Sequence, residues 1–423
     1  MDTFNAIDAG PAAPGAADQL SLRRSNLALV LRRLRDQGPR SRARLATELG
    51  VTRSAASSLV SELAERGLVR IGVAERGGLG RPGTSVELDG HTVCGIGAEI
   101  NVNHVATIAL DLTGRVVAEH RMPLDAQRLE VAEVIDHLVD LVRRTTADLT
   151  AQGASPVGLT VGVAGLVDRT RDVLTLAPNL AWRDVPVGVM VRERLQPAYP
   201  VVVDNEANLA ATAEAVPGDP LRQDILVIFG EVGLGGGIVA DGRLLRGHQG
   251  YAGEFGHMIV DPRGRRCGCG RIGCWETVAG LRALLDAATD ADDPVRDPVL
   301  GLEARLAELN RRADLGDTRT LDALARVGAW IGVGAAMLAN ALNPGAIVLS
   351  GYLAEVGRHL RPAVEAQLEA GVLAPRAGGT RVELSTLGFT ASVRGGAILA
   401  LESVFADPTR VERQLVAPQG EAR

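Results

Sequence analysis

Residues 253–276 read G-E-F-G-H-M-I-V-D-P-R-G-R-R-C-G-C-G-R-I-G-C-W-E and hold three of the four cysteines of this 423-residue chain, Cys267, Cys269 and Cys274. His257 precedes Cys267 by ten residues. One imidazole nitrogen and three thiolates are a normal ligand set for a tetrahedral structural zinc ion, and intervening glycines allow a short loop to fold back on itself. The stretch therefore predicts a closed Zn²⁺ site that shapes the loop. The alternative interpretation is free thiols in a glycine-rich turn.

Two carboxylates, Glu254 and Glu276, flank the predicted metal site. A metal ion that orders the loop also orders the residues beside its ligands. Rigid acidic groups in a glycine-lined cleft suit hydrogen bonds from the hydroxyls of a small polyol. The alternative is that both are solvated surface glutamates.

The bulk composition is that of a soluble globular protein, with 46% hydrophobic and 23% charged residues. The length predicts two or three domains. We find no apolar run near 18 residues and no signal pattern, so we expect no membrane association. Cysteines grouped at metal spacing, with Cys94 left over, fit the reducing cytoplasm better than a disulfide framework.

Charge is distributed unevenly along the chain. The net charge is −6, yet residues 21–82 contain 13 Arg against 5 acidic residues, or +8, which leaves −14 for the remainder. A basic N-terminal block on an acidic body predicts a module that binds a polyanion.

Three short helices are predicted in this basic block. Residues 26–36 place leucines and a valine on one helical face, and residues 42–49 follow Ser41 as an N-cap, with Leu45 and Leu49 expected to be buried. Thr52 then caps a third helix, which Gly67 ends. Helix, glycine-containing turn and helix form the helix-turn-helix motif. Residues 1–20 lack apolar periodicity and predict a disordered tail.

The third helix has the pattern of a recognition helix in the DNA major groove. Small and polar residues occupy its start, and these are the predicted DNA contacts: Thr52, Arg53, Ser54, Ser57 and Ser58. Residues 68–73 and 84–88 predict a two-stranded hairpin, or wing, whose glycine-rich tip carries Arg81 as a minor-groove contact. The alternative is a protein-interaction module of the same shape.

From Val93 onward the pattern becomes α/β. Apolar strands are predicted at residues 94–98, 105–110, 116–119, 157–163, 201–203, 224–229, 238–240, 347–349 and 382–384, and residues 129–151 predict an amphipathic helix. The glycines of residues 233–237 are expected to form a tight turn with positive φ. The repeated order of strands and helices indicates two α/β lobes.

These motifs resemble the repressor, open reading frame, kinase (ROK) family of the actin-like sugar-kinase superfamily. The resemblance is closest to its regulators with an N-terminal winged helix, of the xylose- and N-acetylglucosamine-repressor type. It rests above all on C-x-C-G-x-x-G-C-x-E and the upstream G-E-x-G-H, and it covers about residues 21–405. It implies that His257 and the three cysteines bind zinc. It also implies a sugar site lined by Asn179, Asn205, Glu206, Glu254, His257 and Glu276.

The chain departs from the family's kinases at three nucleotide-binding elements. The D-x-G-G-T loop is replaced by residues 99–103, E-I-N-V-N, and the second loop, G-T-G-x-G-G-G, begins with Glu231 and Val232. Tyr352 stands where a third glycine-rich segment is expected. A carboxylate near a triphosphate repels it. Glu206 replaces the aspartate that acts as the kinases' general base.

We therefore expect a winged helix-turn-helix followed by a two-lobed actin-like, ribonuclease H-like α/β domain. The predicted segments are a tail at 1–20, a DNA-binding domain at 21–90, lobe one at 91–205 with a return at 388–405, lobe two at 206–387, and a tail at 406–423. The expected function is a cytoplasmic, sugar-responsive repressor without catalytic residues, Glu206 being a vestigial base. It binds double-stranded DNA at a palindromic operator as a homodimer or higher oligomer. The alternative is an ATP-dependent hexose kinase with a DNA-binding appendage.

Overall fold

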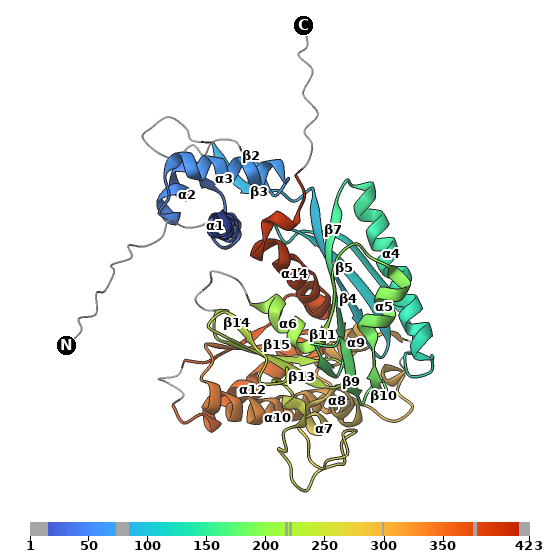
Figure 1. The fold of residues 1–423 in the computed structure, drawn as a ribbon. Coiled ribbons are helices and arrows are strands. Elements are labelled where there is room, and N and C mark those ends of the chain that lie inside the picture. The colour runs from blue at the N-terminus through green and yellow to red at the C-terminus, as the bar shows by residue number, and fades with distance from the viewer. Residues whose placement is uncertain are drawn as a thin grey trace, which may run out of the picture. The chain divides into compact units, whose positions relative to one another are not determined.

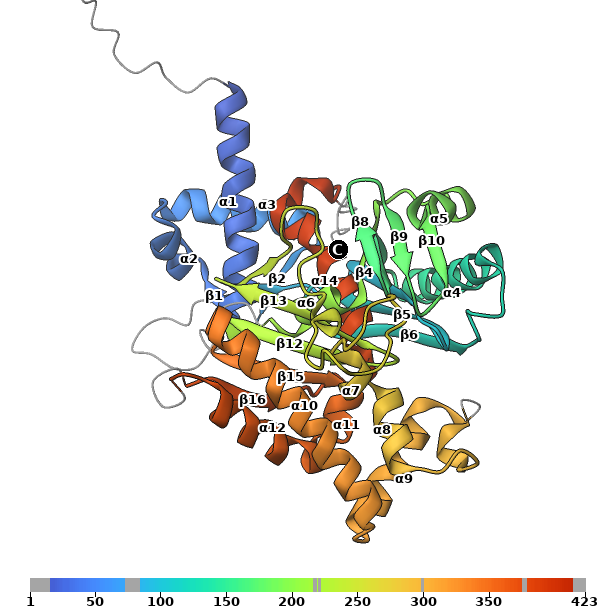
Figure 2. The same cartoon turned by 90° about the horizontal axis from the view of Figure 1, so that it is seen from below.

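The computed structural model describes residues 16–72, 84–215, 219, 222–297, 300–374 and 379–413. Its elements are labelled in Figures 1 and 2. The chain divides into two compact units. The first is Met1–Gly90 together with Glu402–Arg423, and the second is His91–Leu401.

The first unit contains the three predicted helices, α1 (Ala16–Gln37), α2 (Arg42–Leu49) and α3 (Arg53–Glu65). Helix α1 begins at Ala16, so the prediction of a disordered tail is wrong for residues 16–20. Leu20 and Leu22 are both exposed, so no buried face marks this start in the sequence. Helix propagation from an existing helix needs no tertiary partner, because each added residue gains one hydrogen bond without a new nucleus.

The predicted caps of the helix-turn-helix are confirmed. Ser41 Oγ accepts a hydrogen bond from the Arg44 amide, and Thr52 Oγ1 accepts one from the Ala55 amide, each at 3.2 Å. Gly50 ends α2 in the left-handed conformation with φ 65°. Leu45 is fully buried as predicted, whereas Leu49 is only partly buried.

The wing is a sheet of three strands, not two. β2 (Val69–Gly72) pairs antiparallel with β3 (Ser85–Leu88), and β1 (Arg40–Ser41) pairs with the other edge of β3. A two-residue strand shows no alternation of side chains in the sequence, so only the fold can reveal it. The predicted minor-groove residue Arg81 lies outside the described residues.

The end of the chain packs on the N-terminal helices, although the prediction assigned residues 388–405 to lobe one and 406–423 to a tail. The Arg35 guanidinium donates to Glu402 and lies 4.7 Å from the centre of the Phe405 ring. Arg66 Nη1 donates to the Val411 carbonyl at 2.5 Å, just after η6 (Pro408–Arg410). Residues 402–413 are therefore part of the first unit.

The second unit contains two five-stranded sheets with the same topology. In each, the first strand pairs antiparallel with the second and parallel with the fourth. The first sheet has the order β11-β7-β4-β5-β6, with β4 (Val93–Ile100), β5 (His104–Asp111), β6 (Val116–Pro123), β7 (Ser155–Val163) and β11 (Val201–Asn205). The second has the order β14-β13-β12-β15-β16, with β12 (Ile225–Gly230), β13 (Leu234–Ala240), β14 (Arg243–Leu245), β15 (Ala346–Gly351) and β16 (Arg381–Leu384). The prediction of two α/β lobes is confirmed.

Helices cover both sheets (Figures 1 and 2). On the first sheet lie α4 (Val131–Ala151) and α5 (Val187–Leu195), beside a small sheet of β8 (Leu166–Asp168), β9 (Val173–Ala177) and β10 (Trp182–Val185). On the second lie α10 (Thr318–Leu342) and α12 (Gly357–Gly371), with α7 (Glu276–Ala279), α8 (Leu281–Ala288), η3 (Pro294–Arg296), α9 (Leu302–Asp314) and α11 (Tyr352–Glu355) nearby. The helix α6 (Glu206–Glu214) contacts strands of both sheets, and α14 (Ala391–Ala406) follows η5 (Gly388–Thr390).

Two helices of the described chain, Thr318–Leu342 and Gly388–Ala406, are long and apolar enough to cross a membrane by length and composition. More than half of each apolar window is buried inside the protein, 56% and 61% respectively. A helix that is apolar on most of its faces is also what the core of a large domain requires.

The glycine run at residues 235–237 lies inside β13, so the predicted turn is wrong for these residues, whereas residues 231–233 do form a tight connection between β12 and β13. None of these three glycines has positive φ. A Cβ on Gly236 would lie 2.3 Å from the Phe255 ring, and one on Gly237 would lie 2.4 Å from the Ala211 Cβ. The glycines therefore allow η2 (Phe255–His257) and α6 to approach the strand closely.

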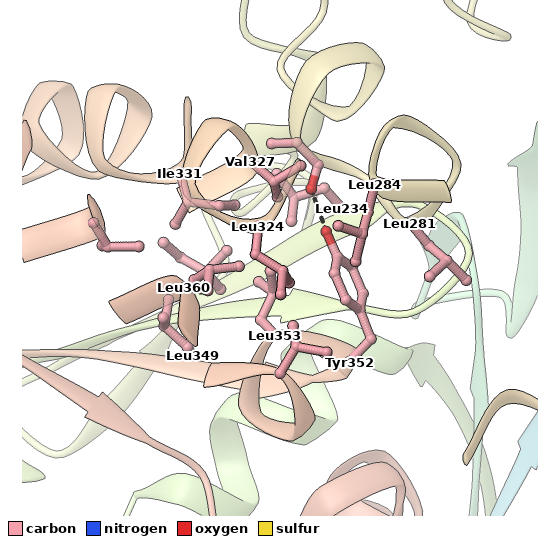
Figure 3. Close-up of a cluster of buried hydrophobic side chains, with 14 of the residues drawn as sticks. Leu234, Leu281, Leu284, Leu324, Val327, Ile331, Leu349, Tyr352, Leu353 and Leu360 are labelled. Atoms are coloured by element: carbon pink, nitrogen blue, oxygen red, sulfur yellow. Dashed lines mark hydrogen bonds between the residues drawn. The ribbon is translucent and has the colours of Figure 1, made fainter. Parts of the chain in front are cut away.

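The second lobe is organised around a buried tyrosine (Figure 3). Tyr352 is fully buried among leucines from α8, α10 and α12, and its hydroxyl donates to the Ala279 carbonyl. The ring therefore packs in the hydrophobic core. In this chain a core residue therefore occupies the position where the resemblance led us to expect a third glycine-rich segment.

Replacing Tyr352 with phenylalanine should lower the free energy of unfolding by about 1–3 kcal/mol, because the Ala279 carbonyl loses its buried donor while the packing remains. Urea unfolding of the full chain measures this difference. An unchanged midpoint would show that the carbonyl finds another donor.

Candidate metal centre and effector cleft

The predicted metal ligands converge in the structure. One ligand atom from each of His257, Cys267, Cys269 and Cys274 lies within 4.8 Å of the others. Cys269 Sγ is 3.6 Å from Cys274 Sγ, and Cys267 Sγ is 3.6 Å from His257 Nδ1. With Zn–S of about 2.3 Å and Zn–N of about 2.05 Å, tetrahedral ligands stand about 3.8 Å and about 3.6 Å apart. The four residues can hold one metal ion.

The loop that carries these ligands is a small irregular hairpin anchored in the core. Isolated bridges join Ile259 to Cys274 and Arg266 to Ile272. Trp275, next to the last cysteine, is fully buried, and its Nε1 donates to the Trp330 carbonyl on α10 at 2.7 Å. Because α7 begins at Glu276, directly after Trp275, an ordered metal loop also fixes the position of the start of α7.

Glu276 joins the metal cluster to the cleft. Its Oε1 accepts from Cys267 Sγ at 2.8 Å and lies 3.7 Å from His257 Nδ1. Burial, and then the hydrogen bond to Glu276, raise the pKa of the Cys267 thiol. A thiolate at this position therefore needs a cation in the cluster, which is what a bound metal ion supplies.

A cleft of about 70 Å³ lies between the two lobes of the second unit. It opens beside a second cavity of about 420 Å³ that shares Asn179, Val232, Gly233 and Glu276 with it. Four of the predicted sugar-site residues line the smaller cleft: Asn179, Glu206, His257 and Glu276. Asn101 and Glu231 also line it, although the sequence singled them out only as departures from the kinases.

Asn205 and Glu254 are not among the residues that line either cavity. Asn205 Oδ1 accepts from the amides of Ala207 and Asn208, and its Nδ2 donates to the Gly165 carbonyl at 2.9 Å. It therefore caps α6 and holds Glu206 at the cleft. Burial, and then the charge of Glu276, raise the pKa of Glu254 to about 7. Direct contact of either residue with a sugar stays a prediction.

Three polar side chains of the cleft are hydrogen-bonded to one another. Asn101 Nδ2 donates to Glu231 Oε2 at 2.6 Å and to Glu206 Oε2 at 3.3 Å. Burial, and then the charge of Glu231, raise the pKa of Glu206 well above its ordinary range. Burial, and then Glu99, raise the pKa of Glu231 to about 7. The cleft therefore offers carboxyl groups to the hydroxyls of a ligand, and those of Glu206 and Glu231 bind a proton more readily than an ordinary glutamate.

The start of α3 presents most of the predicted DNA contacts to solvent. Thr52, Arg53, Ser54 and Ser58 are exposed, and Ser57 is half-buried. Thr52 is also the N-cap, and the Ser58 hydroxyl accepts from Arg23 Nη2 at 3.2 Å. These two side chains therefore have partners within the unit, whereas the Arg53 side chain projects from an exposed position in the first turn.

A model of the ROK family matches residues 95–403. The chain belongs to the ROK family. This confirms the resemblance on which the sugar and zinc expectations rest.

Relatives of this ROK protein include transcriptional regulators and glucokinases. The xylose repressor of Bacillus spizizenii is 28% identical over 388 residues, covering 91% of this chain and 97% of the repressor. A crystal structure of a ROK family transcriptional regulator, a homologue of the Escherichia coli MLC protein, has the same fold, with a TM-score of 0.75 and 22% identity over 92% of this chain and 99% of that one. The ROK glucokinase of Streptomyces griseus, solved with glucose and AMPPNP, is 30% identical with a TM-score of 0.61. That kinase covers 73% of this chain and matches over 99% of its own length.

Proposed function

We propose that this ROK protein is a transcriptional repressor that responds to a monosaccharide or a sugar derivative bound in the cleft of His91–Leu401. The observation that carries the proposal is the near full-length match to a xylose repressor, which extends over the helix-turn-helix as well as the sugar-kinase-like unit. A relative that matched only the second unit would leave the basic module unexplained.

The polar groups of the cleft suit a sugar. Glu206 and Glu276 can accept hydrogen bonds from hydroxyls, and the Asn179 amide can both donate and accept. Structural Zn²⁺ held by His257 and the three cysteines orders the loop and so holds Glu276 against the cleft. The small size of the cleft favours a single sugar unit over a longer chain.

The first unit supplies the DNA contacts. Helix α3 enters the major groove with Arg53 at its start, and a homodimer places two such helices on the half-sites of a palindromic operator. The chain passes between the two units twice, at Gly90–His91 and within α14 at Leu401–Glu402. A tenfold change in operator affinity on effector binding requires about 1.4 kcal/mol of coupling between the two sites.

A binding assay on the full chain tests the proposal. Fluorescence anisotropy on operator DNA, repeated with a panel of monosaccharides and their phosphates, should identify at least one sugar that changes the affinity about tenfold or more. A thermal-shift screen of the same panel checks that this sugar binds the protein. No response to any sugar that binds would contradict an effector role for the cleft.

The alternative function is an ATP-dependent hexose kinase, favoured by the Streptomyces griseus glucokinase match and by Glu206 at the position of a general base. The altered residues 99–103 and 231–232 weigh against it, because they lack the glycines and the threonine hydroxyl that bind phosphates in the family's kinases. An ADP-release assay with a panel of hexoses distinguishes the two. Turnover of about 1 s⁻¹ or more would favour the kinase.

Replacing Asn179 with alanine should abolish the effector response and leave operator binding unchanged, because Asn179 lines both cavities of the second unit. The measurement is operator affinity with and without the responsive sugar. Asn340→Ala is a matched control, since Asn340 lies on α10 and is not among the cavity-lining residues. A normal response in Asn179→Ala would remove this residue from the site.

A further inference from the structure

Three glutamates from separate elements meet beneath the cleft. Glu99 lies near the end of β4, Glu206 begins α6, and Glu231 follows the last residue of β12. One carboxylate oxygen from each lies within 4.8 Å of the other two. Only 1% of Glu99 and 5% of Glu231 is exposed. Strand ends from both sheets therefore bring these carboxylates to one buried point.

The Glu99 carboxylate lacks a hydrogen-bond partner. Both of its oxygens are buried, and neither accepts a hydrogen bond from any described residue. His104 Nε2 stands 3.7 Å from Oε2, which is too far for a hydrogen bond. The ion pair with His104 is the contact that offsets the burial of Glu99, and one Glu99 oxygen also lies within 4.8 Å of oxygens from two other carboxylates. A cation that binds oxygen atoms from all three would offset the repulsion between them.

The charges around the cluster do not balance. Asn101 gives Glu206 and Glu231 one shared neutral donor. His104 and Arg121 are the positive groups that act on Glu231. Even so, burial and then the charge of Glu99 raise the pKa of Glu231 to about 7. Glu254 adds a further carboxylate on the side of Glu206. Either protonation of a glutamate or a cation between the three glutamates offsets this excess of negative charge, and a cation offsets it without protonating a ligand.

We propose that Glu99, Glu206 and Glu231 together bind one divalent cation of the class that prefers oxygen ligands, Mg²⁺, Mn²⁺ or Ca²⁺. Opposite oxygens around such an ion stand about 4.2 Å apart for Mg²⁺ and about 4.8 Å apart for Ca²⁺, which accommodates the separations observed here. The donor set differs from the thiolates of the metal loop, so the two ions do not compete for one site.

A cation at this point links the two sheets of the second unit, because Glu99 belongs to the first sheet and Glu231 follows a strand of the second. It holds the floor of the cleft together whether or not a sugar is bound. The inference goes beyond the effector function, and its test contains no sugar. Its failure would therefore leave the proposed function as it stands.

The test titrates Mn²⁺ into the full chain in its zinc-loaded form and measures free Mn²⁺ by electron paramagnetic resonance. We expect one saturable site per chain and a rise in melting temperature with Mn²⁺. Glu231→Gln and Glu99→Gln should each weaken binding by at least about tenfold, the lower bound for losing even a supporting residue at a metal site. Glu214→Gln is the matched control, since Glu214 is also buried and lies on α6.

Melting without Mn²⁺ separates loss of the site from loss of the fold. Because each glutamine removes charge from a repulsive cluster, Glu231→Gln and Glu99→Gln should melt at the wild-type temperature or above it when no cation is added. Repeating the melts with Mg²⁺ and Ca²⁺ identifies the preferred ion. The proposal is overturned if none of the three ions binds at millimolar concentration, if both variants bind Mn²⁺ as the wild type does, or if Mn²⁺ uptake is matched by loss of zinc.

Discussion

Replacing Cys274 with alanine is expected to release the metal ion and to end the effector response together. Cys274 is fully buried in the metal loop and precedes Trp275, which anchors the loop in the core. A three-ligand remnant binds zinc far more weakly, and Glu276 then loses the ordered loop that positions it. We expect the free energy of unfolding to fall on the order of 5 kcal/mol, part of the roughly 10–16 kcal/mol that structural Zn²⁺ contributes in isolated fingers.

The measurements are zinc content of the purified protein, urea unfolding, and operator affinity with and without the responsive sugar. Cys94→Ala is the matched control, because Cys94 is also fully buried but lies on β4, outside the ligand cluster. It should keep its zinc and its response. A Cys274→Ala protein that is free of zinc and still responds would show that the metal does not order the effector site.

Replacing Glu62 with glutamine should destabilise the DNA-binding unit by on the order of 3 kcal/mol, because it removes the negative charge and one of the two acceptor oxygens that buried and half-buried arginines share. Glu62 lies on α3 with its side chain only 6% exposed. Its carboxylate accepts from Arg23 Nε at 2.7 Å and from Arg66 Nη2 at 2.9 Å, and it lies 3.3 Å from Arg413 Nη2. It therefore connects α1, α3 and the last described residue of the chain.

The same carboxylate predicts how stability depends on pH. Burial acts to raise the pKa of Glu62, but hydrogen bonds from Arg66 and Arg23 outweigh it and hold the pKa below its ordinary value of 4.5. The unfolded chain therefore binds this proton more readily than the folded one. The stabilisation is present above pH 4.5 and is lost as the pH falls through the lower, folded-state value.

Urea unfolding at neutral and acidic pH checks both parts of this prediction, with operator binding as the functional measurement. Wild-type protein should lose stability below pH 4.5, and Glu62→Gln should lose less over the same range. Glu65→Gln is the matched control on the same helix. Its side chain is 48% exposed, so we expect a change within about 0.5 kcal/mol. Equal acid sensitivity of wild type and Glu62→Gln would rule out this role for the carboxylate.

The sequence predicted a feature correctly where the residues that form it lie close together in one segment. Ser41 and Thr52 were predicted as caps because a hydroxyl just before a helix satisfies an amide within the next turn. The metal ligands were predicted because three of the four lie within eight residues, a spacing with few other uses. Neither inference needed to know what packs against the segment.

Short-range patterns in the sequence did not predict contacts between distant segments. The glycines of residues 235–237 suggested a turn, and only the approach of Phe255 and α6 showed that they are needed inside a strand. Asn205 was predicted to line the sugar site, which stays a prediction, and the fold adds that its side chain caps α6 and donates to the Gly165 carbonyl. An amide suits either role, and the choice depends on what the fold places within reach of it.

The sequence alone determined the resemblance to the ROK family, the two α/β lobes, the helices of the basic N-terminal block and the Cys₃His set, since these depend on periodicity, composition and short-range spacing. Tertiary structure alone decided that Glu99, Glu206 and Glu231 meet, and that residues 402–413 join the N-terminal helices. The three glutamates are separated by 107 and 25 residues in the chain, and no local pattern links them. Equivalent strand ends in two repeated sheets bring them together, because each sheet directs its first strand to the same cleft.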